Sequence, residues 1–489
     1  MRVRNFLCSI TALLVIFTSC KEEQKDFSAA KTPGAKENLY EYKNFFLPEK
    51  DGLNQPYVGD TMPYYEDGVY YIYYLKDGGD SYNHSIYLAT TKDFLTYEEY
   101  QEPILEASRG SEQDSWIGTG SVVKVGNKYY LFYTGHSTSL DTKEKIMVAE
   151  GDSLFSFTKK TGWEIDPPAE LRQKTDFRDP EAYFDVESKK IILTVTASKN
   201  NIARILKFSL SLDLSDVSYD GIIFSDPTKK FWNLECSDAF KIGNKYYLTY
   251  SAQNDSLYYA VSDNPYGPYS SVKALDGKLF YAAKHVESED GAYMVGWARR
   301  SESPSSTQEV SAWAGNLLVQ KILQNENGEL LLAPVDSIEN QFDKKVKLLC
   351  KKNTKIEAGS LIHYTEAFDC LESFKISGKF KAEGNGSFGL AFDYNGRTNK
   401  NKLISICPNE EKIELLFNEG STLITETDLE ILPNEEYAFS YIQEGSVGVF
   451  YVDGKKALTV RLYGVCGNKI SLFAENCSVQ FSSLSQFTR

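Results

Sequence analysis

The pattern of apolar and polar positions repeats along the first two thirds of the chain. Each repeat holds an apolar strand, a turn rich in Gly or charged residues, and a second strand of alternating apolar and polar positions, which predicts a β-hairpin. The second strands begin near Tyr70, Tyr129, Ile191, Tyr246 and Tyr293. The hairpin motifs read MPYYEDGVYYIYYL, SVVKVGNKYYLFYTG, EAYFDVESKKIILTVTA, SDAFKIGNKYYLTYSA and HVESEDGAYMVGWARR.

The spacing of these motifs predicts the size of each unit. The second strands start 59, 62, 55 and 47 residues apart, which leaves room for four short strands in each repeat. Further strand-like runs lie between the hairpins: SIYLATT from Ser85, KIMVAEG from Lys145, ARILKFSL from Ala203 and SLYYAVS from Ser256. Five units of four strands predict a five-bladed β-propeller. A β-sandwich with repetitive hairpins is the alternative.

The last third of the chain predicts a second domain. A chain of 489 residues is too long for one core. A lysine-rich stretch, with KKVK from Lys344 and KKNTK from Lys351, follows the last propeller-like segment. Alternating runs with frequent turns then continue to Arg489, which is typical of a β-sandwich. We therefore predict an all-β protein, with the propeller over residues 38–340 and the sandwich over residues 345–489.

The N-terminus predicts export. Arg2 and Arg4 precede an apolar run over residues 6–17 that is too short to span a bilayer. The run ends in FTSC, which resembles a bacterial lipobox, in which the cysteine, here Cys20, becomes the lipidated first residue. We expect a lipoprotein signal peptide over residues 1–20, a flexible tether over 21–37, and a lipid anchor at the bacterial envelope, in the outer membrane or at the cell surface. An ordinary cleaved signal is the alternative.

Net charge and cysteine content limit the classes of ligand that the protein is expected to bind. A formal net charge of -15 argues against nucleic acid, and against a membrane partner other than through the lipid anchor. Beyond Cys8 and Cys20 six cysteines remain, none in a CxxC pair, and the chain has four histidines. This spacing predicts no metal site, and we expect no cofactor. A disulfide in the C-terminal half stays open.

Three acidic residues stand at the same phase of the repeat. Asp60, Asp179 and Glu235 lie 10 to 12 residues ahead of second strands. If each repeat places its leading residue at the same mouth of a ring, the three carboxylates meet at one site, as glycoside hydrolysis requires. Two of the acids also have a plainer interpretation: Asp60 as a turn residue, and Asp179 as a partner of Arg178 or a turn cap. Glu235, between Leu234 and Cys236, is the least natural of the three as a surface residue.

Several motifs resemble one known family. They are GTGSVV from Gly118, FRDP from Phe177, WNLECSDAF from Trp232, FYAAK from Phe280, GWARR from Gly296, WAGNLLV from Trp313 and VFYVDGKKALTVRLY from Val449. In sequence and in order along the chain, these motifs resemble those of glycoside hydrolase family 32, the invertases, inulinases and levanases. Members of that family pair a five-bladed propeller with a C-terminal β-sandwich. The resemblance covers nearly all of the chain from about residue 45.

The resemblance implies roles for the three acids. Asp60 would be the nucleophile, Glu235 the acid/base catalyst and Asp179 the stabiliser of the transition state, in a retaining hydrolysis of β-fructofuranosidic bonds of fructans or fructo-oligosaccharides. Glu235 must then carry a proton at rest, and Asp179 must stay ionised, which Arg178 favours. A retaining enzyme needs the carboxyl groups of Asp60 and Glu235 about 5 to 5.5 Å apart.

The resemblance also implies substrate contacts. Arg178 and Lys284 stand in matching motifs, Thr119 offers a hydroxyl where the family has Ser, and Trp116 could stack on a sugar or fill a blade.

The surroundings of the nucleophile depart from the family. The usual WMNDPNG is here YVGDTMP, so that Gly59, Thr61 and Met62 replace Asn, Pro and Asn. The family's FYQ becomes Tyr73, Tyr74 and Leu75. The missing amide side chains would normally touch the sugar, which implies a divergent member. Two other functions stay open: an inverting arabinan- or xylan-type hydrolase on a related propeller, and a non-catalytic surface lipoprotein that binds glycans.

Overall fold

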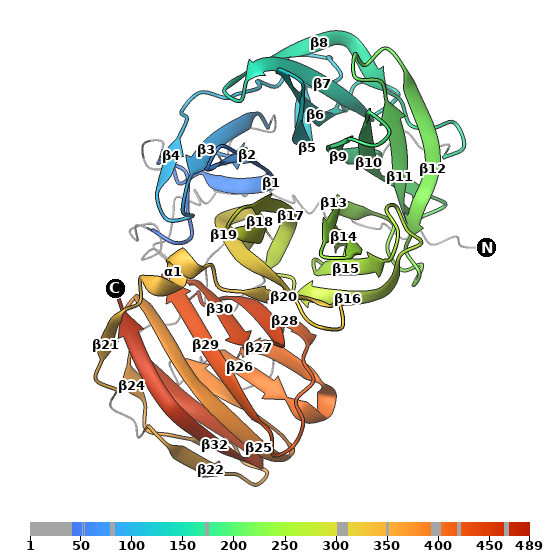
Figure 1. The fold of residues 1–489 in the computed structure, drawn as a ribbon. Coiled ribbons are helices and arrows are strands. Elements are labelled where there is room, and N and C mark those ends of the chain that lie inside the picture. The colour runs from blue at the N-terminus through green and yellow to red at the C-terminus, as the bar shows by residue number, and fades with distance from the viewer. Residues whose placement is uncertain are drawn as a thin grey trace, which may run out of the picture.

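The computed structural model describes residues 42–50, 52, 54–78, 84–171, 176–300, 312–348, 352–392, 402–417, 422–463 and 469–489. The predicted signal peptide, the tether and Cys20 lie outside the described residues. The chain forms a ring of blades followed by a β-sandwich packed against one side of the ring (Figure 1). The predicted fold class is confirmed.

The ring has five blades of four antiparallel strands, each built around a predicted hairpin. The third strands begin at the runs expected between the hairpins, for example Ile86 and Leu257. Blades 5 and 1 join through a bridge between Val58 and Gly315. The innermost strands β1, β5, β9, β13 and β17 surround the axis of the ring (Figure 1).

The strands of the first three blades are as follows. Blade 1 holds β1 (Tyr57–Glu66), β2 (Val69–Asp77), β3 (Ile86–Thr91) and β4 (Tyr97–Glu99); blade 2 holds β5 (Trp116–Val125), β6 (Lys128–His136), β7 (Glu144–Ser153) and β8 (Ser156–Ile165); blade 3 holds β9 (Arg178–Asp185), β10 (Lys190–Lys199), β11 (Ile202–Leu210) and β12 (Val217–Ser225).

The last two blades follow the same plan. Blade 4 holds β13 (Leu234–Ile242), β14 (Lys245–Ala252), β15 (Leu257–Ser262) and β16 (Ser270–Asp276); blade 5 holds β17 (Phe280–Ser288), β18 (Gly291–Arg300), β19 (Ala312–Gln324) and β20 (Leu330–Ala333). A short helix, α1 (Asp336–Asn340), leads from blade 5 to the second domain.

Two strands of twenty residues organise the second domain. β25 (Ser373–Phe392) pairs with β32 (Lys469–Thr488) along most of its length, with β29 in its first half and with β26 in its second half. The other strands are β21 (Lys344–Val346), β22 (Thr354–Glu357), β23 (His363–Tyr364), β24 (Phe368–Asp369), β26 (Lys402–Cys407), β27 (Lys412–Phe417), β28 (Thr422–Asp428), β29 (Glu436–Glu444), β30 (Val447–Val452) and β31 (Lys456–Arg461), with a 3-10 turn, η2, at Pro408–Glu410. Phenylalanine and aliphatic side chains from these strands fill the core of the second domain.

Arg461 of β31 ties the two domains together. Its side chain is 1% exposed and donates to the carbonyl oxygens of Ala298 and Arg299, to Asn316 Oδ1 and to Ser446 Oγ at 2.9 to 3.1 Å. A buried guanidinium is tolerated only when such acceptors replace water. The sandwich is thereby fixed to strands β18 and β19 of blade 5.

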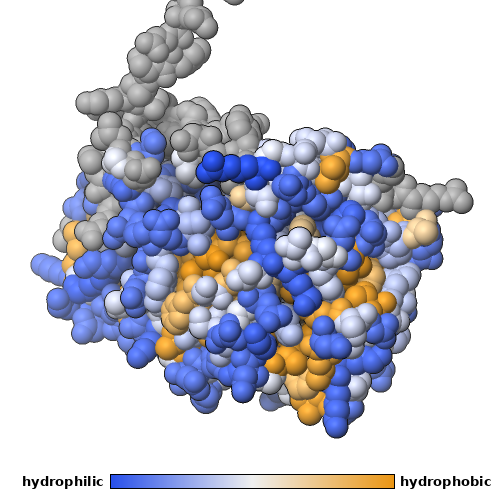
Figure 2. All heavy atoms as spheres, turned by 90° about the horizontal axis from the view of Figure 1, so that it is seen from above, coloured by the Kyte–Doolittle hydropathy of each residue, from blue (hydrophilic) through white to orange (hydrophobic). Residues whose placement is uncertain are grey.

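One face of the surface and four of the cysteines can also be described. Figure 2, which views the molecule from above relative to Figure 1, shows a mostly hydrophilic face with hydrophobic side chains gathered in its middle. None of the helices among the described residues is long and apolar enough to cross a membrane. Four cysteines, Cys236, Cys370, Cys407 and Cys477, are buried free thiols.

Candidate active site

The innermost strand of every blade carries a β-bulge near its start. The pairing of β1 shifts between Val58 and Thr61, and that of β5 between Gly118 and Gly120. The other innermost strands shift at the same place, at residues 178–181 in β9, 235–238 in β13 and 281–284 in β17. Because a bulge leaves one residue unpaired and re-aims its side chain, all five strands depart from regular pairing at one mouth of the ring.

Hydrogen bonds between blades hold three of these bulges. Asp179, Cys236 and Ala282 have positive φ angles of 58°, 51° and 50°, which non-glycine residues seldom adopt. The backbone N–H of each donates to the preceding blade: Asp179 to Thr134 Oγ1 at 2.8 Å, Cys236 to Asp179 Oδ2 at 2.8 Å and Ala282 to Ser251 Oγ at 3.0 Å. The strained backbone therefore follows from the way the blades are joined.

Asp60 of blade 1 faces two indole rings of blade 5. Nε1 of the fully buried Trp297 donates to Asp60 Oδ1 at 3.2 Å, and Trp313 provides a second side-chain hydrogen bond. Burial, followed by the negative charge of Glu235, raises the pKa of Asp60 from 3.8 to about 6, while the two indoles and the Lys284 ammonium oppose the rise. Asp60 and Glu235 thus lie close enough to interact through their charges.

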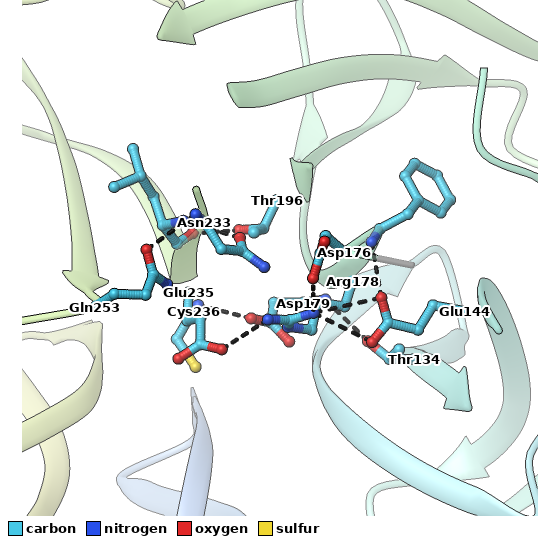
Figure 3. A network of polar contacts seen from close by, with 12 residues as sticks. Thr134, Glu144, Asp176, Arg178, Asp179, Thr196, Asn233, Glu235, Cys236 and Gln253 are labelled. Carbon is cyan, nitrogen blue, oxygen red and sulfur yellow. Dashed lines mark hydrogen bonds and ion pairs between the residues drawn. The ribbon is translucent and has the colours of Figure 1, made fainter. Parts of the chain in front are cut away.

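Arg178 connects three carboxyl groups at the same mouth (Figure 3). Its Nη2 donates to Glu235 Oε1 at 2.7 Å, and its Nη1 contacts Glu144 at 3.1 Å and Asp176 at 3.2 Å. The other oxygen of Glu235, Oε2, accepts from the Tyr281 hydroxyl at 2.5 Å. Glu235 is therefore held at both oxygens, by residues of blades 3 and 5.

Asp179 lies beneath this network and is only 3% exposed. Burial raises its pKa to about 7, although the positive charge of Arg178 works in the opposite direction, and the charges of Glu235 and Asp60 add to the rise. We expected Arg178 to favour the ionised form of Asp179, and its positive charge does lower the pKa of Asp179. Burial outweighs this attraction, because Arg178 bonds Glu144, Asp176 and Glu235 instead.

The predicted substrate contacts have different surroundings. Lys284 is 1% exposed and donates to the Gly120 carbonyl oxygen and to Glu181 Oε2, both at 2.7 Å, so that it acts on Asp60 through its charge. The hydroxyl of Thr119 is buried and has no hydrogen-bond partner among the described residues. Trp116 is partly buried at the start of β5, edge-on to two histidine rings.

Sequence analysis did not single out five residues that the structure places at this mouth. Trp297, Trp313 and Tyr281 contact the predicted acids, and Glu144 contacts Arg178. The fifth, Trp232, is 43% exposed, and Cζ of the Arg178 guanidinium lies 5.8 Å from the centre of the Trp232 ring. The tryptophans stand in the motifs already quoted, but Glu144 lies in an ordinary alternating strand and carries no signal.

One departure from the family pattern has a steric cause. A Cβ atom at Gly59 would lie 2.2 Å from the Trp313 ring and 2.9 Å from the Leu75 carbonyl oxygen. The ring of Trp313 in turn stacks on His84, with ring centres 4.3 Å apart and planes inclined by 13°. The space beside Asp60 that a longer side chain at position 59 would need is therefore filled by an indole.

The polar side chains at this mouth carry carboxylate, indole, phenol and guanidinium groups. Across the part of the chain that the structure describes, no group of His, Cys, Asp and Glu side chains could hold a metal ion. Three carboxyl groups at one mouth, two of which, Asp60 and Asp179, have pKa values raised by burial, are the arrangement of acid/base and nucleophilic chemistry on a glycosidic bond.

Comparison with known proteins decides the family. Residues 46–334, which include every blade, match the model described as "Glycosyl hydrolases family 32 N-terminal domain". The chain belongs to glycosyl hydrolase family 32. It is therefore a glycosidase by family, and the three acids, which stand in three of the blades, lie inside the matched segment.

Known proteins resemble this family 32 chain along most of its length. It is 24% identical over 444 residues to the raffinose invertase of Escherichia coli, covering 84% of this chain and 88% of that protein. It is 23% identical over 511 residues to the levanase of Bacillus subtilis (strain 168), covering 91% and 70%. The crystal structure of fructan 1-exohydrolase IIa from Cichorium intybus superposes with a TM-score of 0.73 at 17% identity, covering 91% of this chain and 96% of that one.

Proposed function

We propose that this protein hydrolyses β-fructofuranosidic bonds of fructans or fructo-oligosaccharides with retention of configuration. The observation that carries the proposal is the convergence of Asp60, Asp179 and Glu235 from three blades at one bulged mouth, where their charges interact. The family supports glycosidase chemistry, and the invertase and levanase relatives support the fructosyl unit.

In the first step the Asp60 carboxylate attacks the anomeric carbon as the bond to the leaving oxygen breaks. Glu235 transfers its proton to that oxygen, and the positive charge that develops on the ring is stabilised by the nearby carboxylates. The two indole N–H groups fix Asp60 in one orientation. A nucleophile held in place in this way enters the reaction with little loss of freedom.

In the second step Glu235 removes a proton from water, and the oxygen of that water displaces Asp60 from the anomeric carbon. Glu235 has to change its protonation state twice in each cycle. Arg178 and Tyr281 hold its two oxygens at 2.7 and 2.5 Å, so the same carboxyl group can serve both steps without moving.

The test is incubation with levan, inulin, sucrose, arabinan and xylan, followed by analysis of the released sugars. We expect fructose from at least one fructoside, and none from Asp60→Ala or Glu235→Gln proteins that retain the parent circular dichroism spectrum. Release of arabinose or xylose alone would contradict the proposal. A folded parent protein without turnover on any substrate would favour a glycan-binding lipoprotein.

We further propose that the protein is exported and lipid-anchored through Cys20. The FTSC motif behind a short apolar run supports this. Metabolic labelling with a fatty acid tests it: the parent chain should carry the label, and Cys20→Ala should not. A parent chain that is cleaved but unlabelled would contradict the anchor.

A further inference from the structure

A cavity opens at the mouth of the propeller opposite to that of the three acids. It has a volume of about 600 Å³ and lies near the ends of three innermost strands, at Asp185 of β9, Lys241 of β13 and Glu287 of β17. Lys241 comes six positions after Glu235 in β13, so that at about 3.3 Å per residue the cavity lies roughly 20 Å from the catalytic mouth. The predicted reaction does not use it.

Aromatic rings form much of its lining. They belong to Tyr183, Phe240, Tyr246, Tyr266 and Tyr269. The rings of Tyr183 and Tyr266 stack on one another with their centres 6.0 Å apart, and these two tyrosines also contact through their hydroxyl groups. Tyrosine combines a flat apolar face with a polar tip, which suits a ligand that has both apolar faces and hydroxyl groups.

Charged groups and a fixed imidazole surround the rings. Asp185, Glu187, Glu287 and Lys241 stand at the rim. The lining also includes His285, whose ring stacks on Phe240 at 4.1 Å. The fully buried Asp238 accepts from both the backbone N–H and Nδ1 of His285, at 2.6 and 2.7 Å. Three rim carboxylates disfavour an anionic ligand, whereas they readily accept hydrogen bonds from sugar hydroxyl groups.

The repeat itself shows that this cavity is open where its counterpart is filled. The segments KVGNKYYLFY and KIGNKYYLTY place a lysine across from a tyrosine in both blades, Lys124 with Tyr129 in blade 2 and Lys241 with Tyr246 in blade 4. In blade 2 both side chains bond to Glu66, the last residue of the preceding blade's innermost strand, with the Tyr129 hydroxyl at 2.6 Å.

In blade 4 the corresponding acid turns away. Asp185 ends the innermost strand of blade 3 as Glu66 ends that of blade 1, but it accepts from the Ser188 hydroxyl at 2.6 Å and from the Glu187 N–H at 3.2 Å within its own turn. Among the described residues nothing hydrogen-bonds the Tyr246 hydroxyl, and Lys241 lies over the Tyr246 ring at 5.4 Å. The same local sequence thus seals one blade junction and leaves the other available.

We propose that this far-mouth cavity is a second sugar-binding site, which holds a unit of an oligo- or polysaccharide while another part of the glycan is cleaved. Its size lies within the range of small-ligand sites, about 300 to 1,000 Å³, and it combines aromatic walls with a few converging polar groups. The choice of ligand class rests on the proposed function. Two sites on one glycan raise the effective concentration at the catalytic mouth.

The test is affinity electrophoresis of the full chain in native gels that contain levan, inulin, arabinan or xylan, with Glu235→Gln as the background to prevent hydrolysis. Tyr246→Ala and Tyr266→Ala should each weaken retardation by the bound polysaccharide about three- to tenfold. Tyr129→Ala is the matched control, because Tyr129 has the same place in the repeat and Lys124 lies over its ring as Lys241 lies over that of Tyr246; it should leave retardation within about twofold of the background protein.

Rates on a short substrate complete the test. In the active protein, Tyr246→Ala should lower kcat/KM for long fructans and leave that for a trisaccharide unchanged. Equal retardation of all variants on every polysaccharide, or equal loss in Tyr129→Ala, would overturn the second site. Failure of the proposed function appears separately, as an absence of released fructose from the parent protein.

Discussion

Arg178 of blade 3 donates from Nη2 to Glu235 Oε1 of blade 4 at 2.7 Å, and this bond crosses the junction between two blades. The same guanidinium is anchored behind by Glu144 and Asp176. A planar group that bonds several carboxylates at once fixes the direction of each. The position of the proposed acid/base catalyst therefore depends on a residue that belongs to the neighbouring blade.

Replacement of Arg178 by lysine should displace Glu235. The ammonium cannot reproduce three separate contacts, and a displacement of about 1 Å at a reacting group costs on the order of 100-fold in rate. We expect Arg178→Lys to lower kcat/KM for the best fructoside about 100-fold, measured by released fructose. The control is Arg204→Lys, since among the described residues the Arg204 guanidinium hydrogen-bonds only the adjacent Ala203 carbonyl oxygen. A kcat/KM equal to that of the parent would refute the positioning role.

Trp297→Phe should change the pH dependence. The indole N–H favours the ionised form of Asp60, so its loss raises a pKa that is already about 6. Because the attacking carboxylate must be ionised, the acidic limb of the kcat/KM profile should move to higher pH, by up to about one pH unit. An acidic limb that stays in place, or moves to lower pH, would show that this hydrogen bond does not set the titration.

Asp60→Asn should remove activity and raise stability at neutral pH. The folded pKa of Asp60 lies above its unfolded value, so the folded protein binds more protons between pH 3.8 and about 6, and this contribution to stability is lost as the pH rises through that window. An amide needs no proton to stay neutral. We expect the free energy of unfolding of Asp60→Asn to exceed that of the parent by about 1 to 3 kcal/mol at pH 8 and to differ little from it at pH 4.

Urea unfolding of the parent and of Asp60→Asn at the two pH values measures this difference. Stability that is equal at pH 8, or a gain that appears only at pH 4, would mean that burial does not disfavour the Asp60 charge.

Arg461→Met should weaken the contact between the domains. The substitution keeps an unbranched apolar stem but leaves four buried acceptors in blade 5 and the sandwich without their donor. Buried polar groups that lose their partner typically cost about 1 to 3 kcal/mol each, partly relieved by water, so we expect a loss of about 2 to 4 kcal/mol in the free energy of unfolding. Chemical unfolding followed by tryptophan fluorescence measures it, and unchanged stability would contradict the role assigned to Arg461.

The repeat allowed much of the fold to be predicted. Hairpins at Tyr70, Tyr129 and their three counterparts set the number of blades, and the third strands followed from the runs between them. The phase of Asp60, Asp179 and Glu235 indicated a common mouth because the innermost strands run in one direction.

The details of the site could not be predicted in this way. The bulges that re-aim the acids leave no mark in the local sequence, since Cys236 and Ala282 adopt positive φ through bonds to other blades. The indoles that hold Asp60 come from the opposite end of the propeller sequence. The rise in the pKa of Asp179 follows from burial, which one sequence does not specify.

The central claim is that Asp60 attacks the anomeric carbon and Glu235 serves both steps. The most direct measurement is carbon NMR of the first sugar released from a fructoside, recorded before the anomers equilibrate. The account predicts β-fructofuranose as the first product, with the configuration of the substrate retained. First release of the α-anomer would mean a single displacement by water, and would contradict Asp60 as a nucleophile.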